Sequence, residues 1–291
     1  MQIFSQYKRA IVVLAVVIGV THPDNVVVAL QPSLAGAAPV NIATHRALYD
    51  FDLAYADLGI GLNGVKGQMY FEQDDTCDAW TTDRRFTTQY QYADRTPDED
   101  SSHYTSFESK DQKQFSFSSE RHENGEMVEL LRGSVEKNVS DGTARAVYSR
   151  PGNISYDLPK GYLLPTLHSI EVIRQARAGR KFFNAVLFDG TDADGPVEIN
   201  VFIGKKVTAA EIQKIAKGNK TIDARLLTPD AWHIRMAVFP LKNREDMLSA
   251  YEMEMIMHDN GVVSDALVDY KTFRVEQKLT ALERLPPRKC P

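Results

Sequence analysis

The chain has 291 residues and a formal net charge of -5, with its acidic residues spread along its length. Proteins that bind nucleic acids normally carry a basic stripe, so this balance argues against a nucleic acid as the partner. Hydrophobic residues make up 43% and charged residues 25% of the chain, which is the balance of an ordinary globular protein.

The N-terminus has the three-part order of a secretory signal peptide. Lys8 and Arg9 supply positive charge, residues 10–20 form an apolar run, and small residues follow at 35–38. The apolar run is shorter than the roughly 20 residues that a transmembrane helix needs. The order therefore predicts an exported protein.

This pattern divides the chain into a signal peptide, residues 1–37, and one folded domain, residues 38–291. Cleavage after Ala29 fits the small-residue rule as well as cleavage after Ala37, and an uncleaved N-terminal anchor is the remaining alternative. We find no Pro/Gly/Ser-rich linker that would divide the remaining chain, so a single domain is expected.

Most of the folded part alternates with a period of two, which is typical of strands with one buried face. The alternating segments are Tyr49 to Tyr55, Met69 to Phe71, Phe86 to Tyr92, Phe115 to Phe117, Val128 to Leu130 and Tyr251 to Met257. Residues 94–103 contain Pro97 and several acids, and are predicted to be a loop.

Asx-Gly pairs, which accept the positive φ angles of tight hairpin turns, punctuate these segments. They lie at Asn63-Gly64, Asn124-Gly125, Asp141-Gly142, Asp189-Gly190 and Asn260-Gly261. The pattern predicts a mainly β protein, built as a large antiparallel sheet that is curled or closed.

Two segments are predicted to be helical. Residues 166–178 follow Pro165, carry one apolar stripe and have arginines near their end. Residues 208–217 begin with a Thr208 and Glu211 capping box and end at a glycine. The second helix is short and lies in a lysine-rich stretch, so we expect a surface excursion.

The chain has two cysteines, Cys77 and Cys290. In an exported protein paired thiols become disulfides, and two cysteines allow one intramolecular connectivity. Two unpaired thiols, or a bond between chains, are the alternatives.

Three motifs match catalytic or ligand-binding patterns and fail on context. The glycines at 59, 61 and 64 match a dinucleotide fingerprint, but a strand follows where a helix is needed. Ser134 and Lys137 match the S-x-x-K pair of penicillin-recognising enzymes without its companion motifs. The acidic stretch 189–195 lacks the ligand positions of an EF-hand loop. The sequence therefore predicts no catalytic residue, no metal site and no cofactor.

The candidate binding residues are Met253, Met255, Met257 and His168. The methionines share one strand face, where they suit the core or an adaptable apolar groove, and copper(I) binding is a weaker alternative. His168 stands near the start of the longer predicted helix, where packing or capping is the alternative to a binding role.

Several stretches together resemble the EipB family of periplasmic envelope-integrity proteins from alphaproteobacteria. The resembling residues are Cys77 to Thr81 with Arg85-Phe86; Leu158 to Gly161 with Pro165-Thr166 and His168; Ala178-Gly179, Phe182 and Phe188 to Gly190; and Asp259 to Val262, Asp269-Tyr270, Leu279-Thr280 and Leu282-Glu283. The predicted excursion at 208–217 and the long leader depart from the family pattern.

The resemblance implies a bowl-like β-spiral with a helix against it and a disulfide between Cys77 and Cys290. It also implies a periplasmic, monomeric, non-enzymatic protein that supports the cell envelope beside partners such as a tetratricopeptide-repeat protein. We consider three functional hypotheses: a bowl that binds a lipid, a hydrophobic peptide or a protein segment; an enzyme that acts on envelope polymers; and a scaffold that works through a sheet edge or the convex face.

Overall fold

The computed structural model describes residues 38–137, 143–242, 248–286 and 288–290. By their contacts, residues 37–291 form one compact unit. The signal-peptide prediction, residues 1–37, lies outside the described residues.

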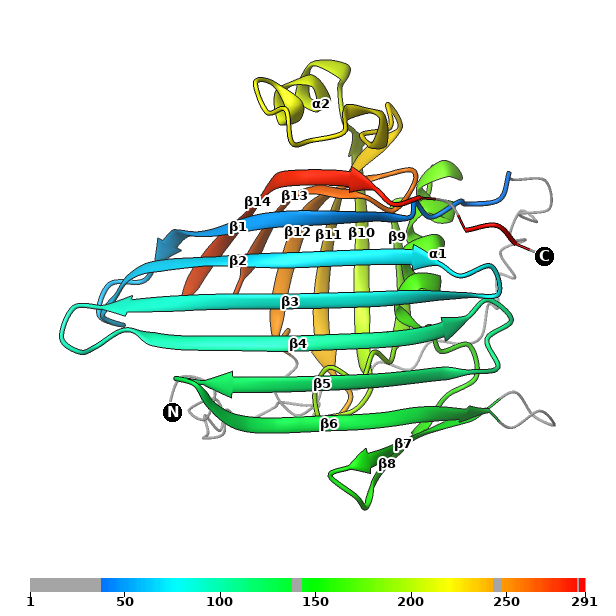
Figure 1. Ribbon diagram of the computed structural model, residues 1–291, viewed down its shortest axis with the longest axis horizontal. Helices are drawn as coiled ribbons and strands as arrows, with labels where there is room; N and C mark the ends of the chain where they lie inside the picture. The colour runs from blue at the N-terminus through cyan, green and yellow to red at the C-terminus, as the bar shows by residue number, and fades with distance from the viewer. Residues whose placement is uncertain (1–37, 138–142, 243–247, 287, 291) are drawn as a thin grey trace, which may run out of the picture. The chain divides into compact units, whose positions relative to one another are not determined.

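Fourteen strands in the described part form a single antiparallel sheet (Figure 1). They are β1 (His45–Ala56), β2 (Leu62–Asp75), β3 (Ala79–Tyr92), β4 (Asp98–Ser109), β5 (Phe115–Glu123), β6 (Glu126–Lys137), β7 (Ala144–Arg150), β8 (Ile154–Leu158), β9 (Phe182–Leu187), β10 (Val197–Lys206), β11 (Ala231–Pro240), β12 (Tyr251–His258), β13 (Val263–Asp269) and β14 (Phe273–Arg284).

The sheet order runs from β8 down to β1, continues with β14, and runs down to β9. The pairing of β1 with β14 is the one that joins strands distant in sequence. The end strands, β8 and β9, are not paired with each other, so the sheet is an open spiral and not a closed barrel. The predicted fold class, a large curved antiparallel sheet, is confirmed.

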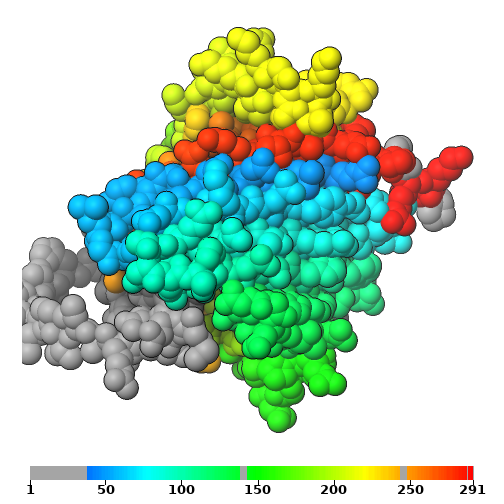
Figure 2. Space-filling model, turned by 60° about the vertical axis from the view of Figure 1, so that its left-hand side comes forward, coloured from blue at the N-terminus to red at the C-terminus, as the bar shows by residue number. Residues whose placement is uncertain are grey.

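One face of the sheet turns toward the opposite half of the spiral, and we call it the inward face. Tyr104 of β4 shows this, since its hydroxyl donates to the carbonyl of Asp189, which follows β9. By register the inward residues include Tyr49 of β1, Arg84 of β3 and Met255 of β12. The alternate residues form the outward face, a continuous surface over β1–β5 in Figure 2.

Helix α1 (Pro165–Arg177) covers the inward face of one half of the sheet. Its buried residues Val172, Ile173 and Ala176 pack in one apolar cluster with side chains of β10–β13. The predicted helix, residues 166–178, is confirmed within one residue at each end. In the other half, the loop of residues 188–196 lies against β4–β8, with Phe188 fully buried among their aromatic rings.

The start of α1 is capped from a distant strand. Leu164, at the N-cap, has no side-chain oxygen with which to accept a hydrogen bond. The carboxylate of Glu108, in β4, accepts instead from the backbone N–H groups of Thr166 at 2.8 Å and Leu167 at 3.0 Å. Glu108 is 1% exposed and belongs to the opposite half of the sheet. The cap therefore ties the helix to both halves.

Helix α2 (Ala209–Ala216) confirms the second predicted helix and its capping box. The helix itself has no buried residue, but the prediction of a mere surface excursion is incomplete. Ile222 pairs with Leu282 of β14 as a parallel bridge, and Leu226 and Leu227 are buried in the core cluster of β1, β2 and β14. The excursion thus packs over β14 and its neighbours (Figures 1 and 2).

The turn predictions divide by context. Asn124-Gly125 and Asn260-Gly261 form the expected tight turns of β5–β6 and β12–β13. The prediction at Asn63-Gly64 is wrong, because both residues lie inside β2, and the turn precedes them. The predicted loop at 94–103 is wrong in its second half, because β4 begins at Asp98 and its acids lie along a strand. Asp141-Gly142 lies outside the described residues.

Asp189-Gly190 serves the 188–196 loop instead of a tight hairpin. Gly190 has a φ of +71°, and a Cβ there would lie 2.4 Å from Cγ of Phe117. Glycine is required because the loop backbone passes directly over this aromatic ring.

Candidate binding surfaces

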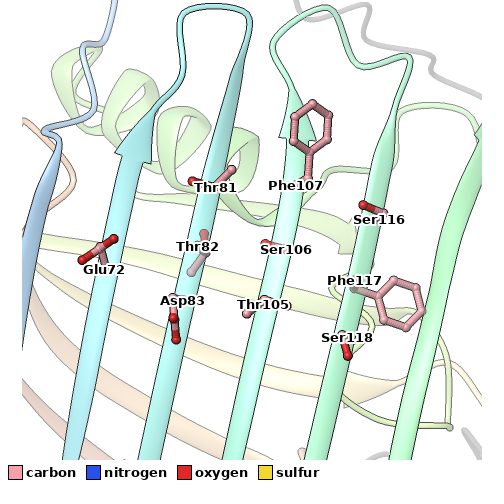
Figure 3. A pocket seen from close by; sticks show the side chains of 10 residues that line it. All are labelled: Glu72, Thr81, Thr82, Asp83, Thr105, Ser106, Phe107, Ser116, Phe117 and Ser118. Atoms are coloured by element: carbon pink, nitrogen blue, oxygen red, sulfur yellow. The ribbon is translucent and has the colours of Figure 1, made fainter. Parts of the chain in front are cut away.

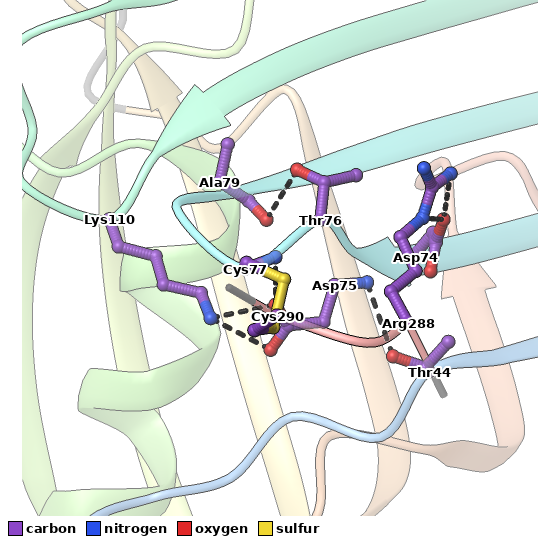
Figure 4. The surroundings of a disulfide bond; sticks show 9 residues. All are labelled: Thr44, Asp74, Asp75, Thr76, Cys77, Ala79, Lys110, Arg288 and Cys290. Atoms are coloured by element: carbon purple, nitrogen blue, oxygen red, sulfur yellow. Dashed lines mark hydrogen bonds and ion pairs between the residues drawn. A yellow bond between two sulfur atoms is a disulfide. The ribbon is translucent and has the colours of Figure 1, made fainter. Parts of the chain in front are cut away.

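The disulfide between Cys77 and Cys290 is present, with Cα atoms 5.6 Å apart (Figure 4). Cys77 lies in the turn between β2 and β3, with a φ of +74°. Cys290 lies in the tail that follows β14. The bond therefore fixes the C-terminal tail to the turn of the β2–β3 hairpin, and leaves no free thiol among the described residues.

Ion pairs hold both ends of this link. The Asp75 carboxylate accepts from the backbone N–H of Cys77 at 2.9 Å and from Nζ of Lys110 at 2.7 Å. Arg288, two residues before Cys290, donates to Asp74 at 2.7 Å (Figure 4). These contacts give the disulfide a structural setting, since its neighbours position the chain on both sides of the bond.

The inward face carries an aromatic group, the inward aromatic strip, which draws on β3, β12, the β13–β14 turn and β14. Its members are Phe86, Tyr90, Tyr251, Tyr270 and Phe273. Four of these five side chains keep part of their surface exposed; Phe273 is buried.

The rings of this strip contact one another. Tyr270 stacks on Phe273 with centroids 4.9 Å apart, and Tyr90 meets Phe273 edge-on at 6.4 Å. Burial raises the pKa of Tyr90 and Tyr251, so both phenols stay neutral at any physiological pH. The strip is thus an uncharged, amphipathic surface that suits apolar or aromatic groups.

Charged groups border the strip. The guanidinium of Arg84 lies 5.1 Å from the ring centroid of Tyr104, and its Nε is buried without a hydrogen-bond partner among the described residues. On the 188–196 loop, burial and the nearby Asp189 carboxylate raise the pKa of Asp192 to about 6. Asp192 accepts from the backbone N–H of Asp194, which opposes that shift.

The candidate residues from the sequence lie on this same face. Met255 and Met257 are 8% and 4% exposed and pack in the cluster beneath α1, whereas Met253 keeps part of its surface. His168 is 5% exposed in α1, its ring 6.2 Å from that of Phe183. Burial lowers the pKa of His168 to about 4, so the ring is neutral. The structure places these residues in or beneath α1, and Met253 also lies two residues along β12 from Tyr251 of the strip.

The outward face has a furrow of about 400 Å³ across β2–β5 (Figure 3). Short hydroxyl side chains dominate its lining, with one aromatic ring and two carboxylates among its outward members. Its lining residues are Glu72, Thr81, Thr82, Asp83, Thr105, Ser106, Phe107, Ser116, Phe117 and Ser118.

The strand register explains why the sheet is hollowed here. Asp83, Thr105 and Ser118 are directly opposite one another on β3, β4 and β5 and form a row of short side chains. On one side Phe107 stands in the next row, 36% exposed. On the other side lies a row of longer side chains that includes Arg85. Short residues between taller ones leave a furrow.

Its carboxylates are held in place. Asp83 accepts from Nη2 of Arg85 at 2.6 Å and from Nε2 of His103 at 3.1 Å. Glu72, directly opposite Asp83 on β2, accepts from the hydroxyl of Tyr70. The furrow residues include no basic side chain, so its charge is negative.

The sequence did not single out this furrow or Glu108. Both lie in or beside β4, half of which was predicted to be a loop, and that obscured the alternation which assigns outward and inward faces. Burial alternates toward the end of β4, but the two large side chains there, Tyr104 and Phe107, are three residues apart and give no period-two signal in the sequence.

The rejected S-x-x-K pair, Ser134 and Lys137, lies on strand β6 and not on the helix that the motif would need. In the part of the chain that the structure describes, no three His, Cys, Asp or Glu side chains gather closely enough to hold a metal ion. None of the helices described there is long and apolar enough to cross a membrane.

A fourteen-stranded open spiral, with a helix on its inward face and its tail held by a disulfide, defines a β-barrel-like class of proteins. The EipB-like family model matches residues 36–286, and the chain belongs to this family. It is 31% identical over 251 residues to the cell envelope integrity protein EipB of Brucella abortus (strain 2308), with 86% of each chain covered.

A solved structure agrees with the fold. The crystal structure of a β-barrel-like protein of the domain of unknown function DUF1849, also from Brucella abortus, has a TM-score of 0.76 and 30% sequence identity. The match covers 85% of this chain and all of that one.

Proposed function

We propose that this protein supports the integrity of the cell envelope from the periplasm, as a non-enzymatic factor that binds a lipid or a hydrophobic peptide on its inward face. The name of the Brucella relative supports the envelope role. The export signal expected in residues 1–37 and the disulfide both suit an oxidising compartment.

The inward aromatic strip is the observation that carries the binding role. Four large aromatic side chains that keep exposed surface gather on one sheet face, beside the partly exposed Met253. A folded protein usually buries such a group or uses it to bind a partner. An acyl chain or an apolar peptide would cover these rings, whose phenols stay neutral.

Native mass spectrometry after mild purification, followed by titration with a lysophospholipid, tests this role. Tyr90→Arg places a charge on the strip and should weaken binding at least tenfold. Gln89→Arg is the matched control, because Gln89 is the adjacent residue and is exposed on the outward face. A protein that is always empty and binds neither lysophospholipid nor an apolar peptide would refute the proposal.

A monomeric state and a partnership with envelope proteins, such as a tetratricopeptide-repeat protein, remain predictions. Size-exclusion chromatography with light scattering measures the first. Crosslinking in cells measures the second, and recovery of cytoplasmic proteins alone would contradict it.

A further inference from the structure

We propose that the furrow on the outward face is a second binding site, and that it takes a neutral glycan chain. This site is separate from the inward strip, because Thr105 and Phe107 point to the opposite side of β4 from Tyr104. It therefore stands or falls independently of the lipid or peptide site.

The lining selects the chemistry of the ligand. Rows of Ser and Thr hydroxyls can each donate and accept a hydrogen bond, which matches a ligand covered in hydroxyl groups. Phe107, exposed at the side of the furrow, offers an aromatic face to the C–H face of a sugar ring. The outward members of the lining carry one ring, Phe107, and no long aliphatic side chain, which is too little apolar surface to enclose an acyl chain.

Charge excludes anionic ligands. Asp83 and Glu72 lie opposite each other along the furrow, and the nearby guanidinium of Arg85 is already paired with Asp83. A phosphate or an acidic polymer would meet these carboxylates without an uncommitted cation. Sugar hydroxyls, by contrast, donate to carboxylates in charge-assisted hydrogen bonds. The contacts from Arg85 and His103 hold the Asp83 carboxylate ready to accept them.

The sheet topology disfavours an extended peptide. Strand β4 lies at the centre of the furrow and is paired along its length with β3 and β5. The backbone N–H and C=O groups of β4 are therefore already paired, and a peptide could not add to the sheet there as a new strand. Recognition must come from side chains, as it does for sugars.

The test is to titrate the protein with an N-acetylglucosamine hexamer and to measure binding by isothermal titration calorimetry or by NMR chemical-shift changes. Phe107→Ala removes the aromatic platform, and Thr105→Arg fills the furrow with a long side chain. Each should weaken binding at least tenfold. The matched control is Phe202→Ala. Phe202 is an aromatic residue of β10 that is 53% exposed on the outward face and lies outside the furrow.

Each outcome decides the proposal. Binding that Phe107→Ala and Thr105→Arg weaken and Phe202→Ala leaves intact supports it. No binding at millimolar hexamer, or equal binding by all variants, overturns it. Thermal melts of the variants, matched to that of the wild type, guard against loss of fold. Displacement of the hexamer by an unstructured Ser/Thr-rich peptide would also overturn it, since it would show a peptide site.

Discussion

The two halves of the sheet are filled in different ways. Over β4–β8 the filling is a loop, and tyrosine hydroxyls bond to its backbone: Tyr104 to the carbonyl of Asp189 at 2.7 Å, and Tyr148 to that of Asp192 at 2.8 Å. Tyr156 adds a third such bond, to the Ala193 carbonyl at 2.6 Å. Over β10–β13 the filling is a helix, held by aliphatic and methionine side chains.

The difference separates two sources of order. Burial is strong but non-directional, so the aliphatic and methionine cluster stabilises α1 without fixing its position along the sheet. Hydrogen bonds are weaker but directional, and the tyrosines fix the loop residue by residue. The helix acquires directional contacts at its two ends: the Glu108 carboxylate of the opposite half accepts at its N-terminus, and Arg177 at its C-terminus donates to both oxygens of Asp259. Three changes, in order of expected effect, test this contrast.

The largest effect should come from the covalent link between the halves. Cys77 and Cys290 are 213 residues apart, and the chain-entropy model gives about 5 kcal/mol for closing a loop of that length. Reduction should lower the melting temperature, and Cys77→Ser and Cys290→Ser should be weakened equally. Equal melting of oxidised and reduced protein would remove the bond from the account of stability.

The cap that joins the halves should come second. Glu108→Ala leaves the N–H groups of Thr166 and Leu167 without their acceptors, in a buried place. Losing partners for buried donors costs about 1–3 kcal/mol, so we expect a loss near the upper end of that range. Glu108→Gln keeps one acceptor and should lose less. Chemical denaturation measures the stability of both variants. Hydrogen exchange shows where the loss occurs, and faster exchange confined to α1 would place the effect in the helix.

Glu108 also predicts a pH dependence. Burial raises its pKa above the ordinary value of 4.5, in spite of the two N–H bonds that lower it. The folded protein therefore holds this proton more tightly than the unfolded chain does. The resulting stabilisation is fully present below pH 4.5 and is lost as the pH rises through the raised pKa. As the pH rises through the raised pKa of Glu108, the free energy of unfolding of the wild-type protein should fall relative to that of Glu108→Gln. A difference that does not change with pH would contradict a raised pKa for Glu108.

These features show what the sequence could predict. Periodicity identified β1, β2, β3, β5, β6, β12 and α1, and the capping box identified α2, because each depends on residues within a few positions. The cap of α1 could not be found that way, since Glu108 acts 58 residues away from Thr166. Asn63-Gly64 failed for the same reason: pairing with β3 across 62–75 overrode a local turn signal. The disulfide was predictable because two cysteines allow one pairing.

The furrow needs the register of four strands, and no single segment contains it. Thr105 is polar and lies in a stretch rich in Ser and acidic residues, so nothing in that stretch alone distinguishes it from its neighbours. Only its position opposite Asp83 and Ser118 makes it part of a hollow. Sites built by alignment across a sheet follow from tertiary pairing, whereas sites built on one helix or turn follow from local sequence.

The smallest effect tests the contrast between the halves most directly. Tyr148→Phe keeps the ring in its aromatic cluster but removes the bond to the Asp192 carbonyl, so we expect a loss of about 1 kcal/mol. Amide exchange in the 188–196 loop should also accelerate. Met255→Leu is the matched change beneath α1, and such volume-conserving swaps cost less than about 1.5 kcal/mol. Met255→Leu should leave amide exchange in α1 unchanged, because apolar packing is non-directional and tolerates a side chain of similar volume but different shape. The opposite result would be faster amide exchange in α1 for Met255→Leu and unchanged exchange in the loop for Tyr148→Phe. It would show that packing, and not hydrogen bonding, fixes the positions of these segments.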